Sequence, residues 1–283
     1  MRLVVISGRS GSGKSTALNV LEDIGFYCID NLPIGLLPDL IREADANDKL
    51  TRIAVSIDAR NLAHAVGRID ELLNALPHPC QIDVVYLDAS DSVLMQRFSA
   101  TRRKHPLTRE EVSLAEAIEL EKQLLDPLAN MANLTLDTTS MSVHELRRLI
   151  HVRVAERNGS DMSILFESFG FKHGIPTDAD YVFDVRHLPN PYWDETLRGY
   201  TGMDEPVQMF LSSYAEVAEM RESIAGFMDH WMPHFIRSSR SYMTIAIGCT
   251  GGQHRSVFLT EQLAAIFRQK YRLVQVRHRE LAD

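Results

Sequence analysis

A glycine-rich segment near the N-terminus, residues 8–15 (GRSGSGKS), matches the phosphate-binding pattern G-x-x-x-x-G-K-[ST]. A strand pattern (LVVIS) precedes it and a helical pattern (TALNVLEDI) follows it, which is the context that the motif requires. Glycines let the backbone wrap a phosphate chain with its N–H groups pointing inward, and the helix N-terminus adds a favourable dipole. We expect Lys14 to reach the β- and γ-phosphates of a nucleotide and the Ser15 hydroxyl to coordinate Mg²⁺. The predicted nucleotide contacts of this segment are Gly8, Arg9, Ser10, Gly11, Ser12, Gly13, Lys14 and Ser15.

A second ligand for the magnesium ion should lie at the end of a neighbouring strand. Asp58, which follows the strand pattern IAVSI, and Asp88, which follows VVYL, both fit this position. We favour Asp58 because its strand is the third in chain order, where small P-loop kinases usually place this carboxylate, and Asp88 is the alternative. Lys14 and Asp58 are therefore the predicted catalytic residues, and Ser15 and Asp58 are the predicted metal ligands. The next residues put a cation and an amide beside the same pocket, so the further predicted cofactor contacts are Asp58, Ala59, Arg60 and Asn61.

Two further segments fit the layout of a P-loop kinase. Residues 30–33 (DNLP) follow the second predicted strand, where such kinases bind the group to be phosphorylated. Residues 101–106 (TRRKHP) supply three cations where a lid could neutralise the transferred phosphate: Arg102, Arg103 and Lys104. The alternatives are a simple strand-end turn at Asp30 and a solvated basic turn at the lid.

A second glycine loop lies near the C-terminus, between a strand pattern and a helical pattern. Residues 248–256 (GCTGGQHRS) match C-x-x-G-x-x-R-S, the arrangement found in cysteine phosphatases. These enzymes usually carry a histidine before the cysteine, where this chain has Gly248, and no aspartate can be assigned as the general acid. We expect the loop to capture a phosphate or sugar phosphate without catalysis, while catalysis by Cys249 and a purely structural turn remain the alternatives. The predicted ligand contacts are Gly248, Cys249, Thr250, Gly251, Gly252, His254 and Arg255.

Basic residues gather just before the C-terminus, in a stretch of twelve residues (268–279) without an acidic side chain. On an acidic chain this pattern favours a local contact with a phosphate backbone, and a solvated amphipathic end is the alternative. The predicted RNA-binding residues are Lys270, Arg272, Arg277, His278 and Arg279.

The elements that position these residues alternate between β-rich and helical patterns, which predicts parallel βαβ units and an α/β fold. We expect strands at 3–7, 26–29, 53–57, 84–87 and 134–136, then at 164–166, 181–185, 243–247 and 273–276. Helical patterns cover 207–235 and 256–270, and capping boxes at 108–111 and 142–145 are expected to open two earlier helices. The predicted domains are a P-loop NTPase (kinase-like) domain at 1–156, a linker at 157–162, and an α/β ligand-sensing and RNA-binding domain at 163–283.

The composition limits the classes of protein to which the chain can belong. A net charge of −8 over 283 residues argues against a wholly basic nucleic-acid binder, although it allows a local basic patch. Three scattered cysteines have no metal-ligand spacing, and free thiols are typical of a reducing compartment. The first apolar stretch is too short for a signal peptide, and no run of about 18 apolar residues predicts a membrane span. We therefore expect a cytoplasmic protein that makes no membrane contact.

Five segments together resemble the RNase adapter (RapZ) family of P-loop nucleotide-binding proteins, and the resemblance extends over nearly the whole chain. They are GRSGSGKS, GFYCIDNLP, SIDARN, FESFGFKHGIPTDADYVFDVRHLPNP and AIGCTGGQHRS. The resemblance implies hydrolysis of ATP and GTP, with ATP contacted at residues 8–15 and a guanine nucleotide at residues 58–61. It also implies a homo-oligomer whose C-terminal domain binds small regulatory RNAs, senses glucosamine-6-phosphate, an amino-sugar phosphate, and presents one RNA to an endoribonuclease. Enteric members continue into a lysine- and arginine-rich end, whereas this chain ends in ELAD, which weakens the expectation that it binds the same RNAs.

The leading hypothesis is thus a nucleotide-binding regulatory protein with weak ATPase or GTPase activity that acts as an RNA-binding adapter. The first alternative is a P-loop metabolite kinase that uses Lys14, Asp58 and the basic lid on an acceptor near Asp30. The second alternative is a cysteine phosphatase centred on Cys249 and Arg255.

Overall fold

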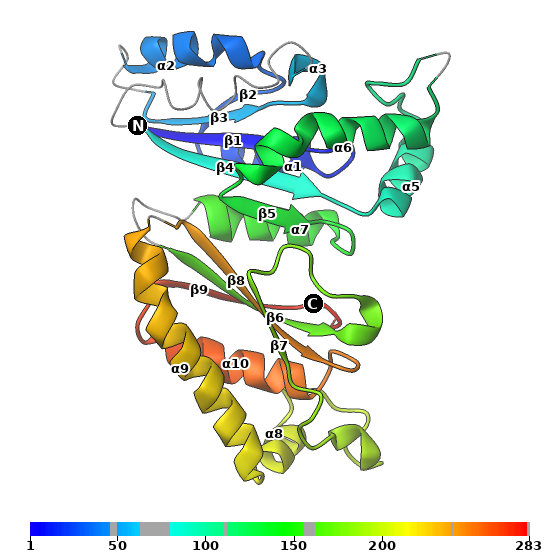
Figure 1. The fold of residues 1–283 in the computed structure, drawn as a ribbon, viewed down its shortest axis with the longest axis vertical. Coiled ribbons are helices and arrows are strands. Elements are labelled where there is room, and N and C mark those ends of the chain that lie inside the picture. Colours follow the sequence, from blue (N-terminus) through cyan, green and yellow to red (C-terminus); the bar gives the residue numbers. More distant parts are fainter. Residues whose placement is uncertain (46–49, 63–79, 110–111, 156–161, 239, 282–283) are drawn as a thin grey trace. The chain divides into compact units, whose positions relative to one another are not determined.

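The computed structural model describes residues 1–45, 50–62, 80–109, 112–155, 162–238 and 240–281 (Figure 1). The chain divides into two compact units, Met1–Glu156 and Arg157–Asp283, called here the first and second units. The predicted linker falls outside the described residues except for Met162.

The described residues of the first unit form a five-stranded parallel sheet with the strand order β2-β3-β1-β4-β5. Its strands are β1 (Arg2–Gly8), β2 (Tyr27–Ile29), β3 (Arg52–Ser56), β4 (Gln81–Asp88) and β5 (Leu134–Asp137). The central strand β1 is buried along its whole length, so the sheet is covered on both faces, as parallel sheets generally are. The expected α/β fold with parallel βαβ units is confirmed.

Helices and short helical turns lie between and after these strands along the chain of the first unit. They are α1 (Lys14–Asp23), the 3₁₀ turn η1 (Ile34–Leu36), α2 (Leu37–Asp45), α3 (Ala59–Leu62), α5 (Asp91–Thr101), α6 (Leu114–Asn130), α7 (Val143–Ile150) and the π-helical turn η2 (His151–Ala155). Alternate residues of the central strands, including Leu3 and Val5, pack against α2 and α6 in one hydrophobic cluster.

Capping boxes open two helices, one of them at a position other than the expected one. Ser142 and Glu145 form the expected capping box of α7. The expected box at 108–111 was wrong, because α6 begins at Leu114 with Ser113 and Glu116 as its box. The Thr108 backbone N–H and hydroxyl instead both donate to the carbonyl oxygen of His105, which closes a tight turn.

Within its described residues, the second unit forms a four-stranded parallel sheet with the order β7-β8-β6-β9. Its strands are β6 (Ser163–Gly170), β7 (Tyr181–Asp184), β8 (Tyr242–Cys249) and β9 (Leu273–His278). Its helices are the 3₁₀ turns η3 (Phe171–His173) and η4 (Pro191–Trp193), then α8 (Glu205–Ser212), α9 (Ala215–Arg237) and α10 (Arg255–Arg268). The expected helical stretch at 207–235 is therefore two helices.

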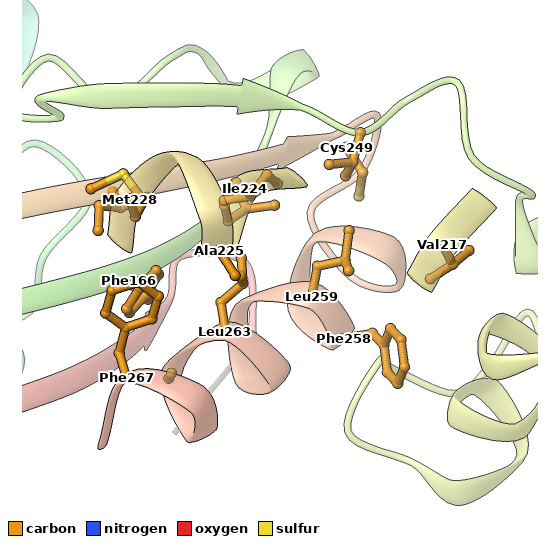
Figure 2. Close-up of a cluster of buried hydrophobic side chains, with 14 of the residues drawn as sticks. Phe166, Val217, Ile224, Ala225, Met228, Cys249, Phe258, Leu259, Leu263 and Phe267 are labelled. Carbon is orange, nitrogen blue, oxygen red and sulfur yellow. The ribbon is translucent and has the colours of Figure 1, made fainter. Parts of the chain in front are cut away.

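The core of the second unit lies between its sheet and helices α9 and α10 (Figure 2). Phe166 of β6 packs against Phe267 of α10, with the ring centroids 5.3 Å apart. Met228 of α9 and Leu263 of α10 belong to the same buried cluster, which also contains Cys249. This packing fixes the loop between β8 and α10 at the carboxyl end of the sheet, where ligands bind in parallel α/β folds.

Candidate functional site

The phosphate-binding loop of the first unit joins β1 to α1, and two of its glycines have conformations that other residues rarely adopt. Gly8 has a φ of 137°, and a Cβ at this position would lie 2.0 Å from the carbonyl oxygen of Leu87. Gly13 has a φ of 111°, and its Cβ would lie 2.5 Å from Cδ2 of Leu146. The loop therefore depends on glycine for both backbone shape and space.

Lys14 begins α1 and folds back over the loop. Its Nζ donates to the carbonyl oxygen of Gly8 at 2.6 Å. Burial lowers the pKa of Lys14 below the usual value for lysine, while the charges of Glu121, Asp58 and Asp30 act in the opposite direction. A phosphate bound beside Lys14 would stabilise the charged ammonium further, so the site favours an anionic ligand.

A cavity of about 650 Å³ opens beside the loop and collects most of the predicted groups of the first unit. Loop residues from Ser10 onward line it, together with Asp30, Asp58 and Arg60. The lining also contains the cations Arg97, Arg103 and Lys104, two of which belong to the segment predicted to form a lid. The other predicted residues of this site, Gly8, Arg9, Ala59, Asn61 and Arg102, are not part of the lining.

Two carboxylates are fixed on the strand side of the cavity. Asp58 is only 6% exposed and accepts from the backbone N–H of Arg60 at 3.0 Å and from its Nε at 2.9 Å. Asp30 accepts from the Ser56 hydroxyl at 2.5 Å. With the Ser15 hydroxyl in the same lining, the cavity offers the hard oxygen donors that Mg²⁺ prefers.

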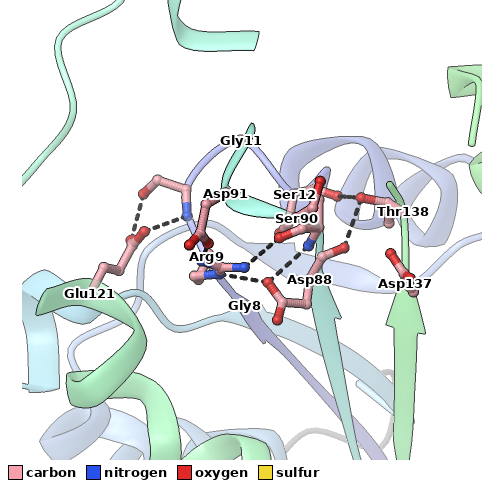
Figure 3. Close-up of polar contacts among 12 residues, drawn as sticks. Gly8, Arg9, Gly11, Ser12, Asp88, Ser90, Asp91, Glu121, Asp137 and Thr138 are labelled. Carbon is pink, nitrogen blue, oxygen red and sulfur yellow. Dashed lines mark hydrogen bonds and ion pairs between the residues drawn. The ribbon is translucent and has the colours of Figure 1, made fainter. Parts of the chain in front are cut away.

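Asp88, the alternative magnesium ligand, is occupied by the loop's own arginine (Figure 3). Its carboxylate accepts from Arg9 Nε at 2.6 Å and from the Ala89 backbone N–H at 2.8 Å. The guanidinium of Arg9 is almost fully buried and also bonds to Asp91 and to the Ala89 carbonyl oxygen. Arg9 thus ties the loop to the turn after β4, and Asp58 rather than Asp88 lines the cavity.

Sequence reasoning missed Glu121 and His105, which lie behind the loop. Glu121 accepts from the Ser10 backbone N–H at 2.8 Å, from the Ser10 hydroxyl at 2.7 Å and from His105 Nε2 at 3.1 Å. A signal for Glu121 was present, because it occupies the same helical face as the apolar Ala117 and Leu125, which are buried.

The loop between β8 and α10 in the second unit is organised around Cys249, which is 2% exposed. Its Sγ accepts from the Gly252 backbone N–H at 3.2 Å and lies 3.1 Å from the Ser256 hydroxyl. Arg255 Nη1 donates to the carbonyl oxygens of Arg186 and Leu188 at 2.6 and 3.0 Å. The buried Nε of Arg255 has no hydrogen-bond partner among the described residues.

A carboxylate from the C-terminal segment lies against the same loop. Gly252 has a φ of 74°, and a Cβ there would be 2.3 Å from Oε2 of Glu280 and 2.7 Å from the Gly170 backbone nitrogen. Burial raises the pKa of Glu280 and lowers that of His254. The side chain of Lys172 lies next to Gly251, with Nζ 3.9 Å from the position of a Cβ there. The loop thus has cationic and acidic groups close to its backbone.

Models of known protein families match nearly the whole length of the chain. A family model described as the RapZ-like N-terminal domain matches residues 1–158, and a model described as the RapZ C-terminal domain matches residues 162–282. The chain belongs to the RapZ family. Similar relatives include a protein named nucleotide-binding protein from Marinobacter nauticus, 56% identical over 99% of this chain and 97% of its own length. A protein of the same name from Hahella chejuensis is 54% identical over the full length of both chains.

Solved structures resemble about half of this RapZ-family chain. An unliganded sugar kinase from Janibacter sp. matches 53% of this chain and 92% of its own, with a TM-score of 0.37 and 19% identity. A shikimate kinase from Acinetobacter baumannii in complex with shikimate matches 56% of this chain and 95% of its own, with a TM-score of 0.36 and 18% identity. Within the part of the chain that the structure describes, no helix is long and apolar enough to cross a membrane.

The five basic residues predicted to bind RNA have different surroundings in this RapZ-family chain. Lys270 and Arg272 are exposed, although Lys270 also bonds to Asp229. Arg277 and His278 are consecutive in β9 and have largely buried side chains: Arg277 Nη1 lies 2.8 Å from Glu167 Oε1, and His278 bonds to both Ser168 and Glu261. The side chain of Arg279 reaches the carbonyl oxygen of Gly174 at 3.4 Å.

Glu167, the partner of Arg277, is a carboxyl group with an unusual environment. Burial raises the pKa of Glu167 to about 7, and the charge of Asp178 adds to the effect, while Arg277 and Arg279 oppose it. The Arg277–Glu167 pair therefore belongs to the interior of the second unit rather than to its charged surface.

Proposed function

We propose that this RapZ-family chain binds ATP or GTP with Mg²⁺ in the cavity of the first unit and hydrolyses it slowly as part of a regulatory role. One observation carries the proposal: Lys14, Ser15 and Asp58 line the same cavity as the lid cations. The names of the relatives from Marinobacter and Hahella, both nucleotide-binding proteins, support it.

In this mechanism the loop N–H groups and the N-terminus of α1 bind the phosphates, and Lys14 compensates their charge. Ser15 and Asp58 would hold Mg²⁺, which supplies charge neutralisation at the phosphates when it is bound. Arg103 and Lys104 stabilise the charge on the phosphoryl group during transfer to water, a reaction that mainly requires positioning and electrostatic stabilisation.

Replacing Asp58 by asparagine tests the metal site. We expect Asp58→Asn to weaken Mg²⁺-dependent binding of ATP and GTP about tenfold or more, because an amide replaces the anionic ligand. Titration calorimetry with and without Mg²⁺ measures this effect. The exposed Asp126 on α6 provides the matched control, Asp126→Asn. If Asp88→Asn abolished the dependence of nucleotide affinity on Mg²⁺ while Asp58→Asn bound nucleotide like the wild type, Asp88 would be the magnesium ligand instead.

A metabolite kinase is the second candidate, since Asp30 lines the same cavity as Lys14 and the lid. An acceptor would bind near Asp30 and receive the phosphoryl group in place of water. Screening sugars and nucleosides for stimulation of ATP turnover distinguishes the regulatory protein from the kinase. In a regulatory protein none of these compounds increases the rate of ATP turnover, whereas in a kinase one class of them increases it strongly. A phosphatase centred on Cys249 is less favoured, because the thiol is buried among core side chains.

For the second unit we propose capture of an amino-sugar phosphate such as glucosamine-6-phosphate by the loop between β8 and α10. The unpartnered Nε of Arg255 and the N-terminus of α10 support an anion there. We further propose that the exposed cations Lys270 and Arg272 contact the backbone of a small regulatory RNA, which an endoribonuclease then processes.

A gel-shift assay with total cellular small RNA tests the adapter role. Lys270→Ala/Arg272→Ala is expected to weaken RNA retention and to lower the slope of log affinity against log salt by about two, one for each lost phosphate contact. Glucosamine-6-phosphate is expected to change the retained fraction of RNA. Arg198→Ala, at an exposed arginine of the same unit, is the control. If the wild-type chain retains no RNA, the adapter proposal fails.

A further inference from the structure

A buried carboxylate lies directly behind the phosphate-binding loop, where an anionic group is unexpected. Glu121 is fully buried in the first unit, and Figure 3 shows it reaching the loop from α6. Removing a carboxylate from water is costly unless it is paired and hydrogen-bonded. Here both carboxylate oxygens accept bonds, from the N–H and hydroxyl of Ser10 and from His105.

The histidine partner is equally fixed. The His105 side chain is fully buried, and its ring packs against Phe98 with the centroids 5.0 Å apart. His105 Nδ1 accepts from the Leu107 backbone N–H at 3.2 Å, so Nε2 carries the proton that is donated to Glu121. The two residues that precede His105 are Arg103 and Lys104, both in the cavity lining.

The charge of Glu121 is maintained by these contacts. Burial by itself raises the pKa of a carboxyl group, but the hydrogen bonds from His105 and Ser10 and the charge of Lys14 lower the pKa of Glu121 below its usual value. An ionised Glu121 therefore attracts two donors that belong to different segments, one in the loop and one in the lid.

We infer that Glu121 and His105 are positioning residues for nucleotide turnover: the Glu121 carboxylate holds Ser10 of the loop and His105 of the lid together, so that Arg103 and Lys104 face the bound phosphates. This inference rests on the proposed nucleotide function. In this arrangement, the positions of Arg103 and Lys104 depend on the bond between His105 and Glu121. Breaking the Glu121–His105 bond then reduces turnover more than binding, because Lys14 and the loop N–H groups still contact the phosphates.

The variant His105→Phe tests the inference, because it keeps an aromatic ring against Phe98 and removes the bond to Glu121. Steady-state hydrolysis is expected to show kcat lowered about tenfold, with KM changed less than about threefold. The double variant Arg103→Ala/Lys104→Ala is expected to lower kcat by a similar factor. Adding His105→Phe to this double variant should lower kcat little further, because residues that act through the same mechanism have non-additive effects. His144→Phe, at an exposed site on α7, is the control.

A second measurement separates this inference from the proposed function. Hydrogen exchange of residues 101–109 in the nucleotide-free protein is expected to accelerate in His105→Phe and in Glu121→Ala, while exchange in β1 stays unchanged. Absence of nucleotide turnover in the wild type would refute the proposed function, and the exchange result would still decide whether the pair positions the lid. Unchanged exchange in the lid, additive effects on kcat, or a wild-type kcat in His105→Phe would overturn the inference.

Discussion

Alanine in place of Lys14 is expected to weaken nucleotide binding about 100-fold and to reduce hydrolysis below detection. Its ammonium lies in the cavity, 2.6 Å from the Gly8 carbonyl oxygen, so it can bond to phosphate oxygens without leaving the loop. Hydrogen bonds to charged groups contribute about 1.5–3 kcal/mol each, which corresponds to roughly ten- to hundredfold in affinity. Calorimetric titration with ATP and GTP measures the loss.

The control for this change is Lys122→Ala, which removes an exposed lysine from α6 in the same unit. Its nucleotide affinity is expected to equal that of the wild type. An affinity of Lys14→Ala within about threefold of the wild type would show that the loop does not hold phosphate through this lysine.

Alanine in place of Gly8 is expected to destabilise the first unit by about 3 kcal/mol or more. The new Cβ would lie 2.0 Å from the Leu87 carbonyl oxygen, and the φ of 137° is unfavourable for alanine. The obstacle is the backbone of a neighbouring strand, so a side-chain rearrangement cannot relieve it. Denaturant unfolding of the full chain, followed by a probe in the first unit, measures the change.

Gly35→Ala is the matched control, because nothing lies within 4 Å of a Cβ at that position and its φ is not positive. It is expected to change the free energy of unfolding by less than about 1 kcal/mol. Equal stabilities of the two variants would contradict the conformation assigned to Gly8.

Local sequence patterns predicted the parts of the fold and site that depend on neighbours in the chain. The residues of the phosphate-binding motif are consecutive, and the strand that ends before Asp58 is a continuous apolar run. Both features are visible in short stretches of sequence, so the α/β fold class and a glycine loop between a strand and a helix could be predicted from the residues alone. The choice of Asp58 over Asp88 stays a prediction, although the lining of the cavity favours it.

Contacts across long stretches of chain could not be predicted in this way. Glu121 meets Ser10 across 111 residues, and its burial depends on how α6 packs against the loop. The parallel register of β6 and β9 places Glu167 directly opposite Arg277, so a residue of the basic segment forms an internal ion pair. A local charge pattern contains no information on such pairing, and the RNA contacts of this segment stay a prediction.

The way in which Arg9 joins the phosphate-binding loop to the turn after β4 has a thermodynamic consequence. Its buried guanidinium bonds to Asp88, Asp91 and a backbone carbonyl, so the shape of the loop is determined when the first unit folds. A ligand then meets a preorganised loop and loses little conformational entropy in ordering it. The rate of association is therefore expected to be limited by diffusion rather than by ordering of the loop.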